Sequence, residues 1–159
     1  MISVRIEGIS YDEETQMAVV ILIDDAGNRV VPIWVGLFEA QAILFKMKDM
    51  AFPRPLTHDL MKNLLATFGA KLEYVLITEI NEGTFYAELH LKDNGKELLI
   101  DSRPSDAIAL ALRAGAPIYV SDKVYAGSFE KEQFLDKQRQ ELYRIFLEYA
   151  DEETFKQKH

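Results

Sequence analysis

The stretch Asp101–Leu112 reads DSRPSDAIALAL and holds the strongest fold signal in this chain. Polar and charged residues occupy its first half, and small or apolar residues follow without interruption. Pro104 suits the first turn of a helix, where its missing N–H would have no partner, and Asp106 suits the positive end of the helix dipole. The run after Asp106 has almost no polar face. We therefore predict a buried helix over residues 104–114 with charged side chains at its entrance.

A second segment, which begins at Arg54, has the same order of residue types. A proline, His58 and Asp59 precede an apolar stretch that stops at a Gly-Ala pair. Thr57 is a suitable N-cap for a helix over residues 58–68. Caps, proline starts and glycine stops are common to many helices, so the similarity only weakly favours an internal repeat.

The remaining elements follow from apolar alternation and turn residues. Strands are expected over residues 2–11, 15–23, 29–35, 72–80, 84–91, 97–100 and 117–120, and a helix over residues 37–47. Pro32 cannot donate to a strand ladder, so its position should lie at an edge or a bulge. We favour a core position for Trp34 over a base-stacking platform, although alternation turns it away from both neighbours and would allow half exposure.

From about residue 129 onward, apolar residues fall at spacings of three, four and seven, which predicts a long amphipathic C-terminal helix. The whole pattern predicts an α+β fold, with a mixed, largely antiparallel sheet and packed helices. We divide the chain into a domain of residues 1–125 and a helical extension of residues 126–159. The extension would pack on the domain or on a partner subunit, so we also predict a homodimer.

Composition narrows the possible functions. The chain has 159 residues, no cysteine and a net charge of −8. Without cysteine there is no disulfide or thiolate chemistry, and the expected location is cytoplasmic. No apolar run approaches the ~20 residues that span a bilayer, so we expect no membrane association. The negative charge argues against a broad phosphate-binding surface, but it allows a local basic cleft or a bound divalent cation.

Three segments resemble the bifunctional nuclease family and occur in the family's order. They are Val31–Gly36, Arg54–Leu60 and Asp101–Leu110, and Glu39-Ala40 and Ala42-Ile43 look similar as well. The resemblance covers roughly residues 1–125. It implies an enzyme that cleaves RNA and DNA, with nucleic acid as its partner. Composition and spacing alone do not show that activity.

A nuclease must stabilise extra negative charge on a phosphate and activate a water molecule. Arginines or a metal ion can do the first, and a histidine or carboxylate can act as the base. His58 is the favoured proton-transfer group because histidine titrates near neutral pH. A divalent cation, Mg or Mn, would suit carboxylate ligands. The candidates are His58, Asp59, Asp101 and Asp106 for catalysis, Arg54 and Arg103 for substrate binding, and Asp101, Asp106 and Glu39 for the metal.

Most candidates also have a structural explanation. Asp59, Asp106 and Glu39 would each complement a helix dipole, and Arg103 would be an ordinary ion-pair partner. Asp101 would accept hydrogen bonds from the turn that follows it, and His58 would lie in an exposed, solvated turn. The sequence contains no Gly-rich phosphate loop, no His-x-x-x-His pair and no Gly-x-Ser-x-Gly elbow. The alternative function is therefore a non-catalytic binding or regulatory module, in which the Arg-Pro-Asp segments are caps and ion pairs.

Overall fold

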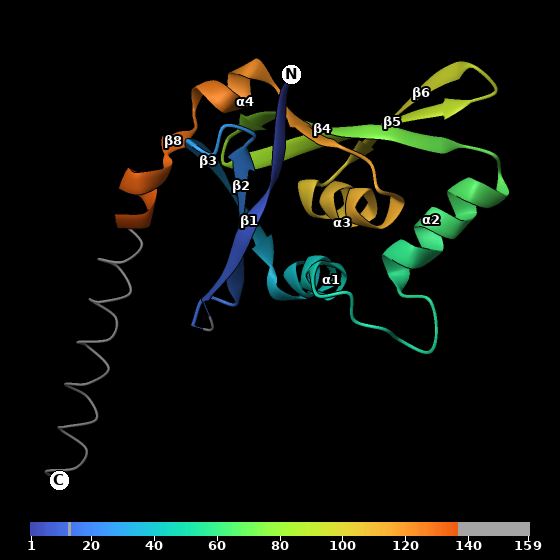
Figure 1. Cartoon of the computed structure of the whole chain (residues 1–159), viewed down its shortest axis with the longest axis horizontal. Helices are drawn as coiled ribbons and strands as arrows, with labels where there is room; N and C mark the ends of the chain where they lie inside the picture. Colours follow the sequence, from blue (N-terminus) through green and yellow to red (C-terminus); the bar gives the residue numbers. More distant parts are fainter. Residues whose placement is uncertain (13, 137–159) are drawn as a thin grey trace, which may run out of the picture.

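Eight strands form one sheet in a computed structural model that describes residues 1–12 and 14–136 (Figure 1). Their order is β6-β5-β4-β7-β1-β2-β3-β8, and every neighbouring pair is antiparallel except β4 with β7. The strands are β1 (Ile2–Asp12), β2 (Met17–Asp24), β3 (Arg29–Gly36), β4 (Lys71–Asn81), β5 (Thr84–Asp93), β6 (Lys96–Ser102), β7 (Ile118–Val120) and β8 (Phe129–Glu130). The helices are α1 (Leu37–Met47), α2 (Thr57–Thr67), α3 (Pro104–Ala114) and α4 (Asp122–Ala126). The predicted α+β fold with a mixed, largely antiparallel sheet is confirmed.

The helix α3 occupies the centre of the molecule. It lies against the sheet, with α1 and α2 on its other side (Figure 1). Its buried residues include Ile108 and Leu110, and the small alanines at 107, 109 and 111 allow close packing all round. Gly115, with φ of 66°, ends the helix in the left-handed region, which glycine adopts without steric cost. The predicted buried helix over residues 104–114 is thus confirmed.

Strand β2 explains its own apolar sequence, because it is buried on both faces. Val20 and Leu22 belong to the main core under the helices. Val19, Ile21 and Ile23 point to the opposite face, where they form a smaller cluster with a valine of β3. A strand between β1 and β3 that is covered on both sides has no polar face to present, so it reads as a continuous apolar run.

The start of α2 differs from the prediction. Thr57 is the first helical residue and Leu56 is the N-cap, with no side-chain capping bond from Thr57. Asp59 instead reaches back, and its Oδ2 accepts a hydrogen bond from the backbone N–H of Leu56 at 2.9 Å. A carboxylate in the third helical position can accept a hydrogen bond from the free N–H of the N-cap residue. This bond stabilises the helix start without a capping hydroxyl.

Strand β3 contains one confirmed expectation and one error. Strand β8 pairs only with Arg29 and Val30, so β3 is an edge strand at Pro32, as predicted. Trp34, which we placed in the core, has 59% of its surface exposed. It faces away from the buried Ile33 and Val35, and no strand covers β3 at that point.

The C-terminal prediction was wrong at its beginning. Residues 129–130 form strand β8, residues 131–136 are helical, and α4 precedes them, capped by the Ser121 hydroxyl, which accepts a hydrogen bond from the Val124 N–H at 3.1 Å. Two-residue pairing such as that of β8 leaves no periodicity to detect. Most of the predicted long helix, and the dimer contact assigned to it, lie outside the described residues.

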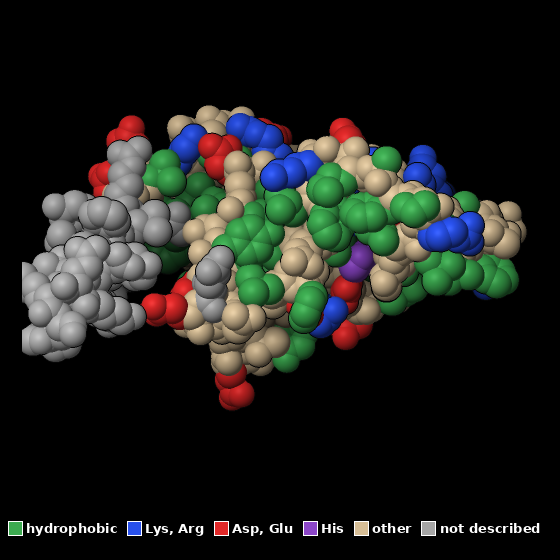
Figure 2. Space-filling view, turned by 90° about the horizontal axis from the view of Figure 1, so that it is seen from below, with side chains coloured by type: hydrophobic (Ala, Val, Ile, Leu, Met, Phe, Trp, Pro, Cys, Tyr) green, Lys and Arg blue, Asp and Glu red, His purple; other side chains and the backbone are tan. Residues whose placement is uncertain are grey.

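The face that carries α1 and α2 shows many hydrophobic side chains among scattered charged ones (Figure 2). Phe38 in the first turn of α1 and Phe68 just after α2 are strongly exposed. Within residues 1–12 and 14–136, no helix is long and apolar enough to cross a membrane.

Candidate functional site

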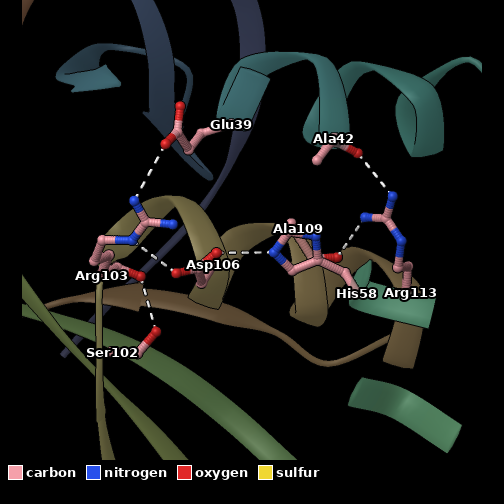
Figure 3. Close-up of polar contacts among 8 residues, drawn as sticks. All are labelled: Glu39, Ala42, His58, Ser102, Arg103, Asp106, Ala109 and Arg113. Atoms are coloured by element: carbon pink, nitrogen blue, oxygen red, sulfur yellow. Dashed lines mark hydrogen bonds and ion pairs between the residues drawn. The ribbon is translucent and has the colours of Figure 1, made fainter. Parts of the chain in front are cut away.

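The first turns of three helices meet at one place, and each contributes a polar side chain. Helix α1 contributes Glu39, α2 contributes His58 and α3 contributes Asp106, while Arg103 immediately precedes α3 (Figure 3). The prediction that both arginine-led segments start helices therefore leads to a shared site, with a third helix start that follows Gly36. We call Glu39, His58, Arg103 and Asp106 the helix-start cluster.

Asp106 lies at the centre of the cluster. Its Oδ1 is 2.9 Å from His58 Nε2, and its Oδ2 accepts a hydrogen bond from Arg103 Nε at 2.8 Å. Arg103 also donates from Nη1 to Glu39 Oε1 at 3.2 Å. These contacts form one chain, Glu39–Arg103–Asp106–His58, as Figure 3 shows. The His58–Asp106 contact joins residues 48 positions apart in the sequence, and the Arg103–Glu39 contact joins residues 64 positions apart.

Exposure falls from Arg103 through Asp106 to His58. The Arg103 side chain is 64% exposed, that of Asp106 26% and that of His58 only 9%. An incoming phosphate would therefore meet Arg103 first. His58 lies behind Asp106, where its imidazole can hold the carboxylate in one orientation.

The charges in the cluster stabilise one another. Burial alone would raise the pKa of Asp106, but the hydrogen bonds and charges of Arg103 and His58 outweigh it, so that pKa lies below its ordinary value. The hydrogen bond and charge of Asp106 raise the pKa of Arg103. At neutral pH, Asp106 is therefore a carboxylate that accepts hydrogen bonds, and Arg103 carries a full positive charge next to solvent.

Asp59 points away from the cluster toward a buried arginine. Its Oδ1 accepts a hydrogen bond from Arg113 Nε at 3.1 Å. Arg113, near the end of α3, also donates to the carbonyl oxygens of Ala109 at 2.9 Å and Ala42 at 2.8 Å. This arginine ties α1, α2 and α3 together, so the geometry of Asp59 is that of a structural counter-ion.

Sequence reasoning overlooked Arg113. The available signal was a single charged residue near the end of an otherwise apolar helix. A buried charge of that kind needs a partner of opposite charge and further hydrogen bonds. The sequence does not reveal which acid supplies it.

Two other candidates stay apart from the cluster. Asp101 is exposed in β6, opposite Glu88 of β5, and Arg54 is exposed in the loop before α2. Neither side chain makes a hydrogen bond or an ion pair within the described part of the chain. Their proposed roles in catalysis and substrate binding stay predictions that this geometry does not favour.

The expected metal ligands do not form a metal site: Glu39 and Asp106 belong to the cluster, but Asp101 does not. Among the described residues, no three acidic or histidine side chains form a group that could hold a metal ion. Arg103 lies between Glu39 and Asp106, and both oxygens of Asp106 already face nitrogen atoms. A divalent cation would have to displace the guanidinium group, so this donor set does not fit the Mg or Mn site that we expected.

An open hollow of about 340 Å³ adjoins the cluster. The end of β3, the first turn of α1, the turn between β4 and β5, and the start of α3 form its walls. Arg103 and Glu39 line the hollow together with Trp34 and Ser105. The exposed arginine therefore belongs both to the helix-start cluster and to a cavity of ligand-binding size.

Comparison with known proteins assigns the chain to a family. The model of the bifunctional nuclease domain family matches residues 20–134, and the chain belongs to that family. The earlier resemblance is thereby confirmed. An uncharacterized protein of Mycobacterium tuberculosis is 44% identical over 123 residues, which are 77% of this chain and 73% of that protein.

Plant relatives are more distant and longer. Bifunctional nuclease 1 of Oryza sativa subsp. japonica is 28% identical over 116 residues, or 71% of this chain and 35% of that protein. Bifunctional nuclease 2 of Arabidopsis thaliana is 28% identical over 107 residues, or 65% of this chain and 32% of that protein. The chain thus matches about a third of each plant protein.

Proposed function

We propose that this protein hydrolyses phosphodiester bonds of RNA and DNA at the helix-start cluster. Membership of the bifunctional nuclease domain family and the names of the plant relatives support the activity. One structural observation carries the choice of site: the exposed guanidinium of Arg103 is held by Asp106 on one side and Glu39 on the other, at the mouth of an open hollow.

Arg103 has the properties of a phosphate ligand. A guanidinium group matches two phosphate oxygens at once and stays charged at every working pH. Its contact with Asp106 uses Nε and its contact with Glu39 uses Nη1, so Nη2 makes no hydrogen bond to the described residues, and the side chain lines the hollow. A positive charge fixed in place before the substrate arrives stabilises the extra negative charge of the transition state.

Glu39 is the group best placed to take a proton from the attacking water. Its contact with Arg103 is the longest in the cluster, at 3.2 Å, and a phosphate that binds Arg103 would compete for it. The released carboxylate would accept the proton as the water oxygen attacks phosphorus. The bond from phosphorus to the leaving oxygen then breaks, and that oxygen takes a proton from solvent.

His58 acts in this scheme as a positioning residue, since it is nearly buried and faces Asp106. That differs from our first choice of His58 as the base, and the two roles are separable. A positioning role predicts that His58→Gln, whose side chain can still hydrogen-bond Asp106, retains more activity than His58→Ala. A base role predicts that both variants lose activity equally.

The decisive experiment measures cleavage of end-labelled single-stranded RNA and DNA by the purified chain. Arg103→Ala should lower kcat by about 10²–10³-fold, as removal of other transition-state charge ligands does. Glu39→Gln and Asp106→Asn should also lower kcat. Arg54→Ala and Asp101→Ala test the roles that the sequence suggested for these two exposed charges, and the geometry of the cluster predicts an unchanged rate for both.

Added chelator, Mg and Mn test the remaining metal prediction in the same assay. Activity that survives chelation agrees with the poor fit of the carboxylates to a cation. If the wild-type chain cleaves neither RNA nor DNA under any of these conditions, the proposed function is wrong. If it cleaves equally well without Arg103, the proposed site is wrong.

The non-catalytic alternative has one observation in its favour. The four side chains of the helix-start cluster satisfy one another, as a structural network would. Under that alternative, the wild-type chain is inactive, and Arg103→Ala and Asp106→Ala lower the melting temperature by several degrees.

We also retain the proposals of a homodimer and a cytoplasmic location. The dimer proposal depends on the apolar pattern of residues 126–159, most of which the structure does not describe. A monomeric mass by light scattering at micromolar concentration would contradict it.

A further inference from the structure

Trp34 is an exposed aromatic side chain on the wall of the hollow that Arg103 also lines. Phe38 and Phe68 are even more exposed, but of these three aromatic residues only Trp34 lines the hollow. Strand β8 pairs only with Arg29 and Val30, so it does not extend along β3 as far as Trp34. The chain has no other tryptophan.

The rest of the wall combines apolar and hydrogen-bonding groups. Met17 and Phe85 contribute apolar surface, and Thr84 and Ser105 contribute hydroxyl groups. Ser105 is buried as a residue, and its hydroxyl has no hydrogen-bond partner among the described residues. Every fully buried side-chain nitrogen or oxygen in the described residues has a partner, so this hydroxyl must be accessible from the hollow. Its hydroxyl is therefore available to a ligand in the hollow.

We propose that the hollow takes one unstacked base of a single-stranded nucleic acid, with Trp34 as the stacking surface and Arg103 on the adjacent phosphate. This inference rests on the proposed function and names the form of substrate that its site accepts. A base inside a duplex is stacked on both faces and cannot lie against an indole ring. A single strand offers a free face, and stacking of this kind tolerates any base sequence.

The acidic charge of the chain strengthens the inference. With a net charge of −8, general attraction to phosphates cannot supply much affinity. Stacking can, since one base on an aromatic side chain typically gains about 5- to 100-fold in affinity. Binding should accordingly depend on salt much less steeply than in a basic nucleic-acid-binding protein.

The test uses the fluorescence of Trp34 as a direct signal. The full chain is titrated with three probes: an octathymidylate with phosphorothioate linkages that resist cleavage, an abasic strand with the same linkages, and a blunt duplex. The octathymidylate should quench the fluorescence. The abasic strand should bind about 5- to 100-fold more weakly without quenching, and the duplex should not quench it.

Variants separate stacking from general binding. Trp34→Ala should weaken octathymidylate binding, measured by anisotropy, by about 5- to 100-fold and leave abasic binding within about twofold. Trp34→Phe should retain most of the affinity. Phe38→Ala is the matched control, because Phe38 is an exposed aromatic residue in the first turn of α1 and does not line the hollow.

The outcomes are distinct from those of the cleavage assay. Quenching by the single strand without any cleavage would support the stacking surface and reject the nuclease. Normal cleavage by Trp34→Ala, with unchanged KM and unchanged octathymidylate affinity, would overturn the stacking surface and leave the nuclease standing. Equal quenching by the duplex or by the abasic strand would also overturn it.

Discussion

Replacing Asp59 by alanine should destabilise the fold and leave the chemistry of the bound substrate intact. The structure gives this carboxylate two hydrogen bonds, one from the Leu56 N–H at 2.9 Å and one from Arg113 Nε at 3.1 Å. Both hold α2 in place. Neither connects Asp59 to the helix-start cluster, although its neighbour His58 belongs to it.

The magnitude follows from the burial of the two partners. Breaking a buried ion pair costs about 3–5 kcal/mol, because it leaves an uncompensated charge. The side chain of Arg113 is 3% exposed but that of Asp59 is 42% exposed, and Arg113 keeps two carbonyl acceptors, so the cost should be lower. With the capping bond included, we expect a loss of about 2–3 kcal/mol in the free energy of unfolding.

Thermal and urea unfolding followed by circular dichroism measure this loss. For a chain of this size it corresponds to about 5–10 °C in melting temperature. Asp101→Ala is the matched control, since its exposed carboxylate has no partner among the described residues, and it should change stability by less than about 0.5 kcal/mol. In an Arg113→Met background the cost of Asp59→Ala should shrink, because the buried charge is gone.

The refuting result is equally definite. If Asp59→Ala unfolds like the wild type but loses kcat when assayed well below its melting temperature, Asp59 is catalytic, as the sequence first suggested. Stability losses that are the same with and without the Arg113 charge would show that the two residues do not act as a pair.

Three further predictions concern other parts of the molecule. A Cβ at Gly36 would collide with the Glu39 carboxylate, while the backbone there suits alanine, so Gly36→Ala should displace Glu39 from Arg103 and lower kcat/KM about as much as Glu39→Gln does. Burial would raise the pKa of Asp24, but hydrogen bonds from backbone amides and a tyrosine hydroxyl lower it overall. Its stabilisation is therefore present above the unfolded-state pKa of about 3.9 and disappears as the pH falls through the lower folded-state pKa, so the cost of Asp24→Asn in urea unfolding should shrink between pH 5 and pH 2. Ile108 is fully buried in α3, and Ile108→Ala should lower the free energy of unfolding by about 2–5 kcal/mol in the same measurement.

Element boundaries were predictable where a local chemical rule sets them. Pro104 and Gly115 mark the ends of α3 because one lacks an N–H and the other adopts a positive φ. The two-sided burial of β2 was legible as an uninterrupted apolar run. Strand β8 and the exposure of Trp34 were not predictable from the sequence. Both depend on which residues of β3 the short strand β8 pairs with at the edge of the sheet.

The candidate site divides in the same way. Local sequence determines which residues start a helix. All four members of the helix-start cluster were already among the candidate site residues. Arg103 and Asp106 are a local pair, but the other contacts of the cluster join residues 48 and 64 positions apart. Asp59 and Asp106 have the same local setting in sequence, yet one faces Arg113 and the other faces His58 and Arg103.

By itself, the sequence determined the family, through the three segments that resemble it. It also determined the fold class and the charged residues that open each helix, because hydrophobic period and capping chemistry act over a few neighbouring residues. Only the tertiary structure decided which of those charges meet, which are buried as counter-ions and which stand beside an open hollow. That choice comes from packing α1, α2 and α3 together, since the direction of a side chain across a helix interface depends on every surface that the helix touches.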